Sequence, residues 1–179
     1  NDFMQISAGG NHALALKENG SVIAWGDNSK GQCNVPSDND FISVAAGYEF
    51  SVGLKDDGSI IAWGDNLYGQ CIVPQENDFI EIDAGFNHSV ALKADGTAVA
   101  WGFNLYGQCN ISPETKFISI AAGETHTTGI KIDTTLKSWG WDNPYPPVPG
   151  DTTNIPVPSG NGFTNIAAGK NYSIALKID

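Results

Sequence analysis

Residues 84–108 read AGFNHSVALKADGTAVAWGFNLYGQ, and close copies of this stretch recur along the chain. Its tryptophan belongs to a series in which each member lies 38 residues after the last and precedes a glycine: Trp25, Trp63, Trp101 and Trp139. Phenylalanines keep the same step and recur once more after 46 residues: Phe3, Phe41, Phe79, Phe117 and Phe163. A fixed period of this length indicates a repeat architecture, in which each unit is one supersecondary element.

One repeat unit predicts four short β-strands, at residues 41–46, 50–55, 59–63 and 71–73. In the second of these, apolar residues alternate with small or polar ones, as expected of a half-buried strand. Asp57-Gly58 supplies the positive-φ residue that a tight hairpin turn requires, whereas the fourth unit has Asp133-Thr134 there. Pro74 ends the fourth strand. No stretch has a sustained helical period, so the sequence predicts an all-β chain.

Four short strands in every ~40 residues are typical of a β-propeller blade. A WD-type unit would end in Trp-Asp rather than the Trp-Gly found here, and Kelch units are longer, at ~50 residues. The sequence therefore predicts a single all-β domain over residues 1–179, a β-propeller or partial propeller arc of four-stranded blades. Its units are residues 3–40, 41–78, 79–116 and 117–162, with a partial unit at 163–179. The repeated tryptophans are expected to pack between neighbouring blades.

The pattern Ala-Gly-x-x-His-Ser-x-Ala-Leu-Lys-x-Asp-Gly, followed by Ala-Trp-Gly-x-Asn-x-x-Gly-Gln, resembles the RCC1-like repeat in its short bacterial form. Within that family, the repeats look most similar to those of members that inhibit β-lactamases. The resemblance implies a propeller, and members of the family usually close a ring of seven blades. Four complete units and one partial unit therefore predict a fragment of a longer propeller. The alternative is an open arc whose exposed strand edges lead to self-association.

The charge balance excludes some classes of partner. Twenty acidic residues stand against nine lysines and no arginine, which gives a formal net charge of −11. Nucleic acid is not an expected partner, because Lys and Arg supply most of the affinity for phosphate. No apolar run approaches the ~20 residues of a membrane helix, so we expect a soluble protein without membrane insertion. The resemblance favours an extracellular or cell-surface bacterial location.

The histidines and cysteines each occupy one phase of the repeat, which favours packing over chemistry. The histidines share a phase in which other units carry Phe50 and Tyr172: His12, His88 and His126. The cysteines fall in the predicted fourth strand: Cys33, Cys71 and Cys109. Zinc needs three or four ligands around one point, and a nucleophile needs a base oriented by a third group. The spacing offers neither, so we expect no catalytic site, no metal site and no cofactor, and a protein that is not an enzyme.

Two loops in each unit vary while their frames stay fixed. One follows the Ala-Gly pair and the other follows Trp-Gly, so both are expected on one face of the propeller. Aromatic residues rimmed by acidic ones are the composition of a protein-binding surface. The candidate partner-binding residues are Tyr48, Glu49, Asp65, Leu67, Tyr68, Phe86, Phe103, Leu105, Tyr106, Trp141 and Asp142.

These observations predict a non-enzymatic protein–protein interaction scaffold, whose rigid β frame presents variable loops to a protein partner. The resemblance implies a narrower alternative, a secreted inhibitor of a bacterial enzyme of the β-lactamase-inhibiting kind. Eukaryotic relatives suggest a third role, exchange-factor activity on a small GTPase. The short repeats and the absence of arginine make that third role the least favoured.

Overall fold

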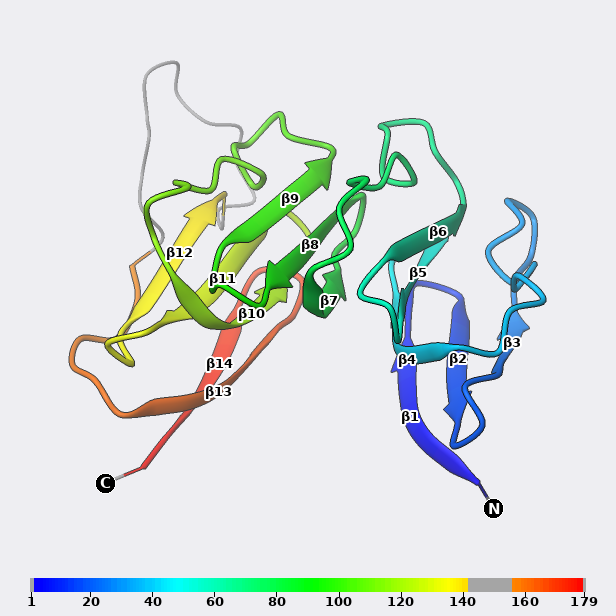
Figure 1. The fold of residues 1–179 in the computed structure, drawn as a ribbon. Helices are drawn as coiled ribbons and strands as arrows, with labels where there is room; N and C mark the ends of the chain where they lie inside the picture. Colours follow the sequence, from blue (N-terminus) through cyan, green and yellow to red (C-terminus); the bar gives the residue numbers. More distant parts are fainter. Residues whose placement is uncertain (1, 142–155, 179) are drawn as a thin grey trace.

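The computed structural model describes residues 2–141 and 156–178, and these form five antiparallel β-sheets without a helix (Figure 1). No helix that could cross a membrane therefore occurs among these residues. The strands are β1 (Phe3–Ala8), β2 (His12–Lys17), β3 (Val22–Gly26), β4 (Phe41–Ala46), β5 (Phe50–Lys55), β6 (Ile60–Gly64), β7 (Phe79–Ala84), β8 (His88–Lys93), β9 (Ala98–Gly102), β10 (Phe117–Ala122), β11 (His126–Lys131), β12 (Leu136–Gly140), β13 (Phe163–Ala168) and β14 (Ser173–Lys177). Consecutive strands pair within each sheet, and the last sheet has only β13 and β14.

The five sheets follow one another in chain order, and each packs against the next. β2 contacts β4, β5 contacts β7, β8 contacts β10, and β11 contacts β13. Each sheet with the loop that follows it is one blade, and the two chain ends lie on opposite sides of the arrangement in Figure 1. The described chain is therefore an arc of blades.

The first four blades have three described strands each, rather than the predicted four. Residues 71–73 form a turn and an extended segment, with no strand assigned. The backbone of this segment bonds locally, because the Cys71 N–H donates to Asn66 Oδ1 at 2.9 Å and the Ile72 N–H donates to the Gly69 carbonyl at 2.9 Å. Pro74 has no N–H to offer a neighbouring strand. Local hydrogen bonds have replaced the predicted ladder.

The predicted hairpin turns are confirmed. Gly58 and Gly96 have φ values of 80° and 83°, in the left-handed region that favours glycine. The Asp57 carboxylate accepts a hydrogen bond from the Ser59 N–H at 2.9 Å, which fixes the turn from its other side. In the fourth blade, Thr134 takes the glycine position with φ 60°, an uncommon conformation for a β-branched residue.

Gly58→Ala should destabilise the protein more than Gly96→Ala, although both glycines have nearly the same φ. Either alanine costs about 1 kcal/mol for a positive φ. A Cβ at Gly58 would also lie 2.3 Å from the Asn77 carbonyl oxygen, whereas at Gly96 the nearest atom is 3.1 Å away. Urea unfolding of both variants checks this, and equal losses would contradict it.

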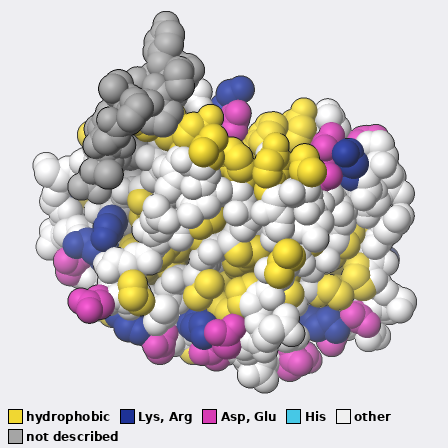
Figure 2. Space-filling view, turned by 90° about the horizontal axis from the view of Figure 1, so that it is seen from above, with side chains coloured by type: hydrophobic (Ala, Val, Ile, Leu, Met, Phe, Trp, Pro, Cys, Tyr) yellow, Lys and Arg dark blue, Asp and Glu magenta, His cyan; other side chains and the backbone are white. Residues whose placement is uncertain are grey.

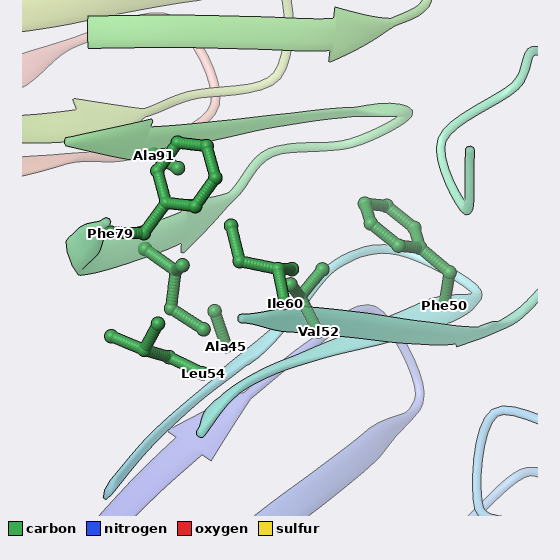
Figure 3. Close-up of a cluster of buried hydrophobic side chains, with 8 residues drawn as sticks. Ala45, Phe50, Val52, Leu54, Ile60, Phe79 and Ala91 are labelled. Carbon is green, nitrogen blue, oxygen red and sulfur yellow. The ribbon is translucent and has the colours of Figure 1, made fainter. Parts of the chain in front are cut away.

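The hydrophobic core lies between blades and repeats with them. In Figure 3, Phe50, Val52 and Leu54 of β5 lie with Phe79 and other buried side chains at the junction of the second and third blades. Three of the repeated tryptophans reach across the junctions between the first four blades, and their Nε1–H groups donate to main-chain carbonyls of the preceding blade: Trp63 to Gln32, Trp101 to Gln70 and Trp139 to Gln108, at 2.8–2.9 Å. The expectation of packing between blades is confirmed for these three, whereas Trp25 of the first blade is 50% exposed.

Two lysines at the ends of second strands, Lys55 of β5 and Lys93 of β8, bind acidic residues at the same end of the sheets. Lys55 lies 2.8 Å from Asp38 and 3.4 Å from Asp40, with its ammonium 5.9 Å from the centre of the Phe41 ring. Lys93 is paired in the same way. Figure 2 shows lysine and acidic side chains beside one another along the lower edge of the view, with hydrophobic side chains gathered near the upper edge. Part of the acidic surplus is thus neutralised at the hairpin-turn end.

Candidate functional site

Both variable loops of a blade lie at the same end of its sheet. The Asp65 N–H donates to the Glu49 carbonyl at 2.9 Å, and the Phe103 N–H donates to the Asn87 carbonyl at 2.8 Å. These bonds join the loop after Trp-Gly to the loop after Ala-Gly. This end of the sheets is the loop face, formed by residues 9–12, 47–50, 85–88 and 123–126 together with residues 27–33, 65–71 and 103–109.

In the second loop, the residues that recur from one unit to the next make a fixed set of hydrogen bonds. In the second blade, buried Gln70 accepts from the Tyr68 N–H at 2.8 Å and donates through Nε2 to Asp65 at 2.8 Å. Asn66 accepts from the Cys71 N–H at 2.9 Å. The frame therefore holds the backbone on both sides of Leu67 and Tyr68, so these side chains project from an ordered loop.

The third blade departs from this frame at one position. Phe103 stands where the first two blades have aspartate, so Gln108 has no carboxylate to bond. Its Oε1 still accepts from the Tyr106 N–H at 3.1 Å, but its Nε2 has no hydrogen-bond partner among the described residues, although Gln108 is fully buried. A buried donor left unpaired costs about 1–3 kcal/mol. The aromatic ring is thus present at a cost in stability.

Phe103 lies between two tyrosines from neighbouring blades. Its ring centre is 4.9 Å from that of Tyr68 and 5.7 Å from that of Tyr106, both in edge-to-face arrangements. Tyr68, Phe103 and Tyr106 are the outer aromatic group. Leu67 and Leu105 are the residues immediately before these tyrosines, and they are 76% and 74% exposed. Apolar side chains of two blades are therefore presented together.

A second pair of aromatic residues lies on the loops that follow Ala-Gly. The rings of Tyr48 and Phe86 stack with centres 3.9 Å apart and planes 18° from parallel. This inner aromatic pair lines an open depression of about 400 Å³, together with Ala-Gly pairs from all five blades. Glu124 and Lys170 also line the depression and form an ion pair at 3.2 Å.

The predicted aromatic cluster is thus two groups on one face. Of the other predicted site residues, Asp65 has a side chain only 15% exposed, bound to Gln70 and 3.5 Å from the Lys30 ammonium, so it holds the loop in place. Glu49 is partly buried. Trp141 is 8% exposed and offers a partner little surface. Asp142 lies outside the described residues.

The histidines bond across blade junctions to hydroxyl groups that the sequence interpretation had not paired with them. The Nε2 atoms lie within hydrogen-bond distance of side chains in the next blade: His12 of Ser51 at 2.9 Å, His88 of Thr127 at 3.0 Å and His126 of Ser173 at 2.8 Å. The first two pairs are 39 residues apart, one repeat step plus one. Comparing neighbouring units one position out of phase could have revealed them.

The direction of these bonds follows from a third partner. Thr127 donates its hydroxyl hydrogen to the Gln108 carbonyl at 2.9 Å, so the His88 Nε2 must carry the hydrogen it shares with Thr127. A histidine that donates to the hydroxyl cannot act as the base that would activate it. Burial lowers the pKa of His88 to about 3, so the ring is neutral at pH 7. The pair stabilises the junction.

One junction lacks the histidine. Phe50 occupies its phase in the second blade, and the facing Ser89 hydroxyl in the third blade is buried without a hydrogen-bond partner among the described residues. The repeat therefore accepts a phenylalanine in the histidine phase, but then leaves a hydroxyl unsatisfied.

The cysteines are free and lie behind the second loops. The Cys71 thiol is 3.2 Å from the Asp65 carbonyl oxygen, and burial raises its pKa to about 11. Burial likewise raises the pKa of Cys109 to about 12. Both thiols are protonated at neutral pH and suit packing rather than nucleophilic chemistry. Residues 2–141 and 156–178 contain no group of three His, Cys, Asp or Glu side chains placed to hold a metal.

The sequence matches the family described as "Regulator of chromosome condensation (RCC1) repeat" over residues 5–32, 41–70 and 79–108. The chain belongs to the RCC1-repeat family. Each matched segment ends at the glutamine that holds the second loop, or at its equivalent. No protein with a curated description matches the chain.

Solved structures share the fold. The RCC1-repeat chain is similar to Prp20p from Saccharomyces cerevisiae, with 25% identity and a TM-score of 0.77, covering 98% of this chain and 56% of that one. It is similar to the CRINKLY WD40 ectodomain of the Arabidopsis thaliana receptor kinase ACR4, with 25% identity, a TM-score of 0.76 and coverage of 99% and 60%. Human WBSCR16 shares the fold at 17% identity, with a TM-score of 0.78 and coverage of 99% and 58%. The chain thus spans little more than half of each, and the predicted all-β propeller fold is confirmed.

Proposed function

We propose that this RCC1-repeat chain is a non-enzymatic protein-binding scaffold that holds its partner on the loop face. The observation that carries the proposal is the outer aromatic group, in which Phe103 replaces a loop-holding aspartate and leaves Gln108 unpaired. A substitution that lowers stability and creates a partly exposed aromatic surface is expected at a functional site. Prp20p, a structural relative, is described by its binding to Gsp1p and histones, which are protein partners.

The physical properties of the loop face suit protein binding. Tyrosine and phenylalanine supply large contact areas, and the hydrogen-bonded loops lose little conformational freedom when a partner binds. The ion pair between Lys30 of the first blade and Asp65 of the second joins these two blades. Asp65 is in the same loop as Tyr68 of the outer aromatic group. An apolar centre next to charged groups is the usual anatomy of an interface.

Two leucines of the loop face are available to a partner. Leu67 and Leu105 are 76% and 74% exposed, so most of each side chain is free to make contact. The narrower candidate function, inhibition of a bacterial enzyme, would use this apolar surface. Inhibition assays with a panel of β-lactamases test that candidate, and no effect at micromolar protein would contradict it.

A photo-crosslinking amino acid placed at Leu67 should capture a partner protein that the same group at Ile132 does not. Ile132 is the control because it is 62% exposed and follows β11 at the hairpin-turn end, opposite the loop face. Tyr106→Ala should then weaken binding of the captured protein by about 10- to 100-fold, the effect of losing an aromatic anchor. Equal capture from both positions, or binding unchanged by Tyr106→Ala, would contradict the proposed face.

A further inference from the structure

Side chains link the first strands of neighbouring blades at the first and third blade junctions, numbered in chain order. At the first junction, the Gln5 amide bonds both the N–H and the carbonyl of Val44, at 2.9 and 3.0 Å. At the third, the Glu81 carboxylate accepts from the Ile120 N–H at 3.2 Å. Ser43 occupies this repeat position in the second blade, and among the described residues no side-chain hydrogen bond joins β4 to β7. The second junction, between the second and third blades, therefore lacks this link.

The second junction also lacks the histidine bond. His12 and His88 bond hydroxyl groups across the first and third junctions, at 2.9 and 3.0 Å. Phe50 holds the histidine phase at the second junction, and the facing Ser89 hydroxyl is buried without a hydrogen-bond partner in the described part of the chain. Two separate positions of the repeat have thus lost their polar link at the same junction.

Apolar packing holds the second junction instead. Phe50 and Leu54 of the second blade lie with Phe79 of the third in one buried cluster (Figure 3). Apart from the lysine pairs at the hairpin-turn end, which recur at the first junction, the described residues place one side-chain hydrogen bond across it, from Trp101 Nε1–H to the Gln70 carbonyl at 2.9 Å. Hydrogen bonds depend on distance and angle, whereas apolar burial is non-directional, so packed elements can slide by small amounts here.

Both aromatic groups of the loop face lie across this junction. Tyr48 of the second blade stacks on Phe86 of the third, with ring centres 3.9 Å apart. Tyr68 of the second blade lies 4.9 Å from Phe103 of the third, in an edge-to-face arrangement. A change in the angle between the two blades would therefore move the halves of each group against one another.

We propose that the arc flexes at the second junction, and that this motion adjusts the spacing of the aromatic groups when a partner binds. The neighbouring junctions keep their side-chain links, so the first blade should move with the second and the fourth with the third. The motion is a property of the chain alone, whereas its use in binding rests on the function proposed for the loop face.

Hydrogen exchange of main-chain amides in the native chain, followed by NMR, tests the motion. The Tyr48 N–H donates across the second junction to the Phe86 carbonyl, and the Phe86 N–H donates across the third to the Gly123 carbonyl, both at 3.3 Å. The two bonds have the same repeat position and length, so they are a matched pair. After correction for intrinsic rates, the Tyr48 amide should exchange about 10-fold faster than that of Phe86. Equal protection of the two amides would overturn the proposal.

A double variant can restore the missing links. Ser43→Gln supplies the amide that the first blade has, and Phe50→His supplies a partner for Ser89. Exchange at Tyr48 should become about 10-fold slower, while exchange at Phe86 stays unchanged. A double variant that keeps its β-structure by circular dichroism but shows the native exchange rate at Tyr48 contradicts the proposal.

The reverse change at the third junction is the matched control. Glu81→Ser together with His88→Phe removes the same two links there, and should speed exchange at Phe86 toward the rate of Tyr48. An unaltered rate at Phe86 would show that these links do not restrain a junction.

The use of the motion in binding has its own measurement. The double variant with Ser43→Gln and Phe50→His should bind the partner captured at Leu67 about 10-fold more weakly, because its junction is fixed in the unbound arrangement. Unchanged affinity would overturn the role of the motion in binding. Failure to capture any partner at Leu67 would instead count against the loop face, and the exchange rates would still test the motion.

Discussion

Between pH 7 and about 4, the wild-type protein should lose about 3 kcal/mol more of its free energy of unfolding than the His88→Phe variant loses. The pKa of His88 is lowered by burial from 6.5 to about 3 in the folded protein, so the folded state keeps the ring neutral while the unfolded chain takes up a proton. The stability from the neutral ring is present above pH 6.5 and is lost as the pH falls toward 3. Each pH unit below 6.5 costs about 1.4 kcal/mol.

Phenylalanine is the matched replacement because Phe50 already occupies the same phase in the second blade. In the variant, Thr127 keeps its hydrogen bond to the Gln108 carbonyl, so the loss at pH 7 should be about 1 kcal/mol. The comparison is made between variants because burial raises the pKa of Asp83 to about 6, which has the opposite effect on the wild-type pH profile.

Urea unfolding followed by tryptophan fluorescence at both pH values measures the difference. Phe50→His is the reciprocal control: it should introduce an acid-sensitive histidine and offer a hydrogen-bond partner to Ser89. If His88→Phe and the wild type change in parallel with pH, the buried histidine does not control the acid response.

Phe103→Asp should raise the free energy of unfolding by about 1 kcal/mol while abolishing partner binding through the outer aromatic group. In the second blade, Asp65 accepts a hydrogen bond from the Gln70 Nε2–H at 2.8 Å. An aspartate at the equivalent position 103 would accept in the same way from Gln108 Nε2, which has no partner among the described residues. The same change removes the ring that lies between Tyr68 and Tyr106. Stability is expected to rise while binding is lost. A variant that lost binding because its fold was disrupted would lose stability as well.

Asp65→Phe is the reverse substitution in the neighbouring blade. It should orphan Gln70, break the ion pair with Lys30 and lower the free energy of unfolding by about 1–3 kcal/mol. Thermal unfolding gives the stability of each variant. Titration with the partner protein that was identified by crosslinking gives the affinity of each variant. A Phe103→Asp variant that is less stable than the wild type would show that the aromatic contacts outweigh the unsatisfied amide.

The sequence was sufficient for the fold because its period is long, regular and marked by residues with distinct roles. The step between Trp63 and Trp101 located the blades, and Asp57-Gly58 located a turn that the structure confirms. The fourth strand could not be predicted correctly from residues 71–73. Alternation of side chains indicates which face a segment would bury, but it does not show that Asn66 and Gly69 bond its N–H groups instead.

The candidate site was predictable only in part. Strand alternation placed both loops at one end, since antiparallel strands return there after every hairpin. Their separation into the inner pair at Tyr48 and the outer group around Phe103 depends on distance from the centre of the arc, which one repeat unit does not contain.

The histidine–hydroxyl junction has a consequence for how such a chain can gain or lose units. The histidine of one unit needs a Ser or Thr hydroxyl in the next unit as its partner. A duplication or deletion of a unit is therefore tolerated according to the side chains that it brings together. Removing the second unit would bring the partnerless Ser89 against His12, turning an unsatisfied contact into a satisfied one. The order of the units therefore determines which histidines and hydroxyl groups face one another. A histidine and the hydroxyl 39 residues after it must be kept together for the hydrogen bond to form.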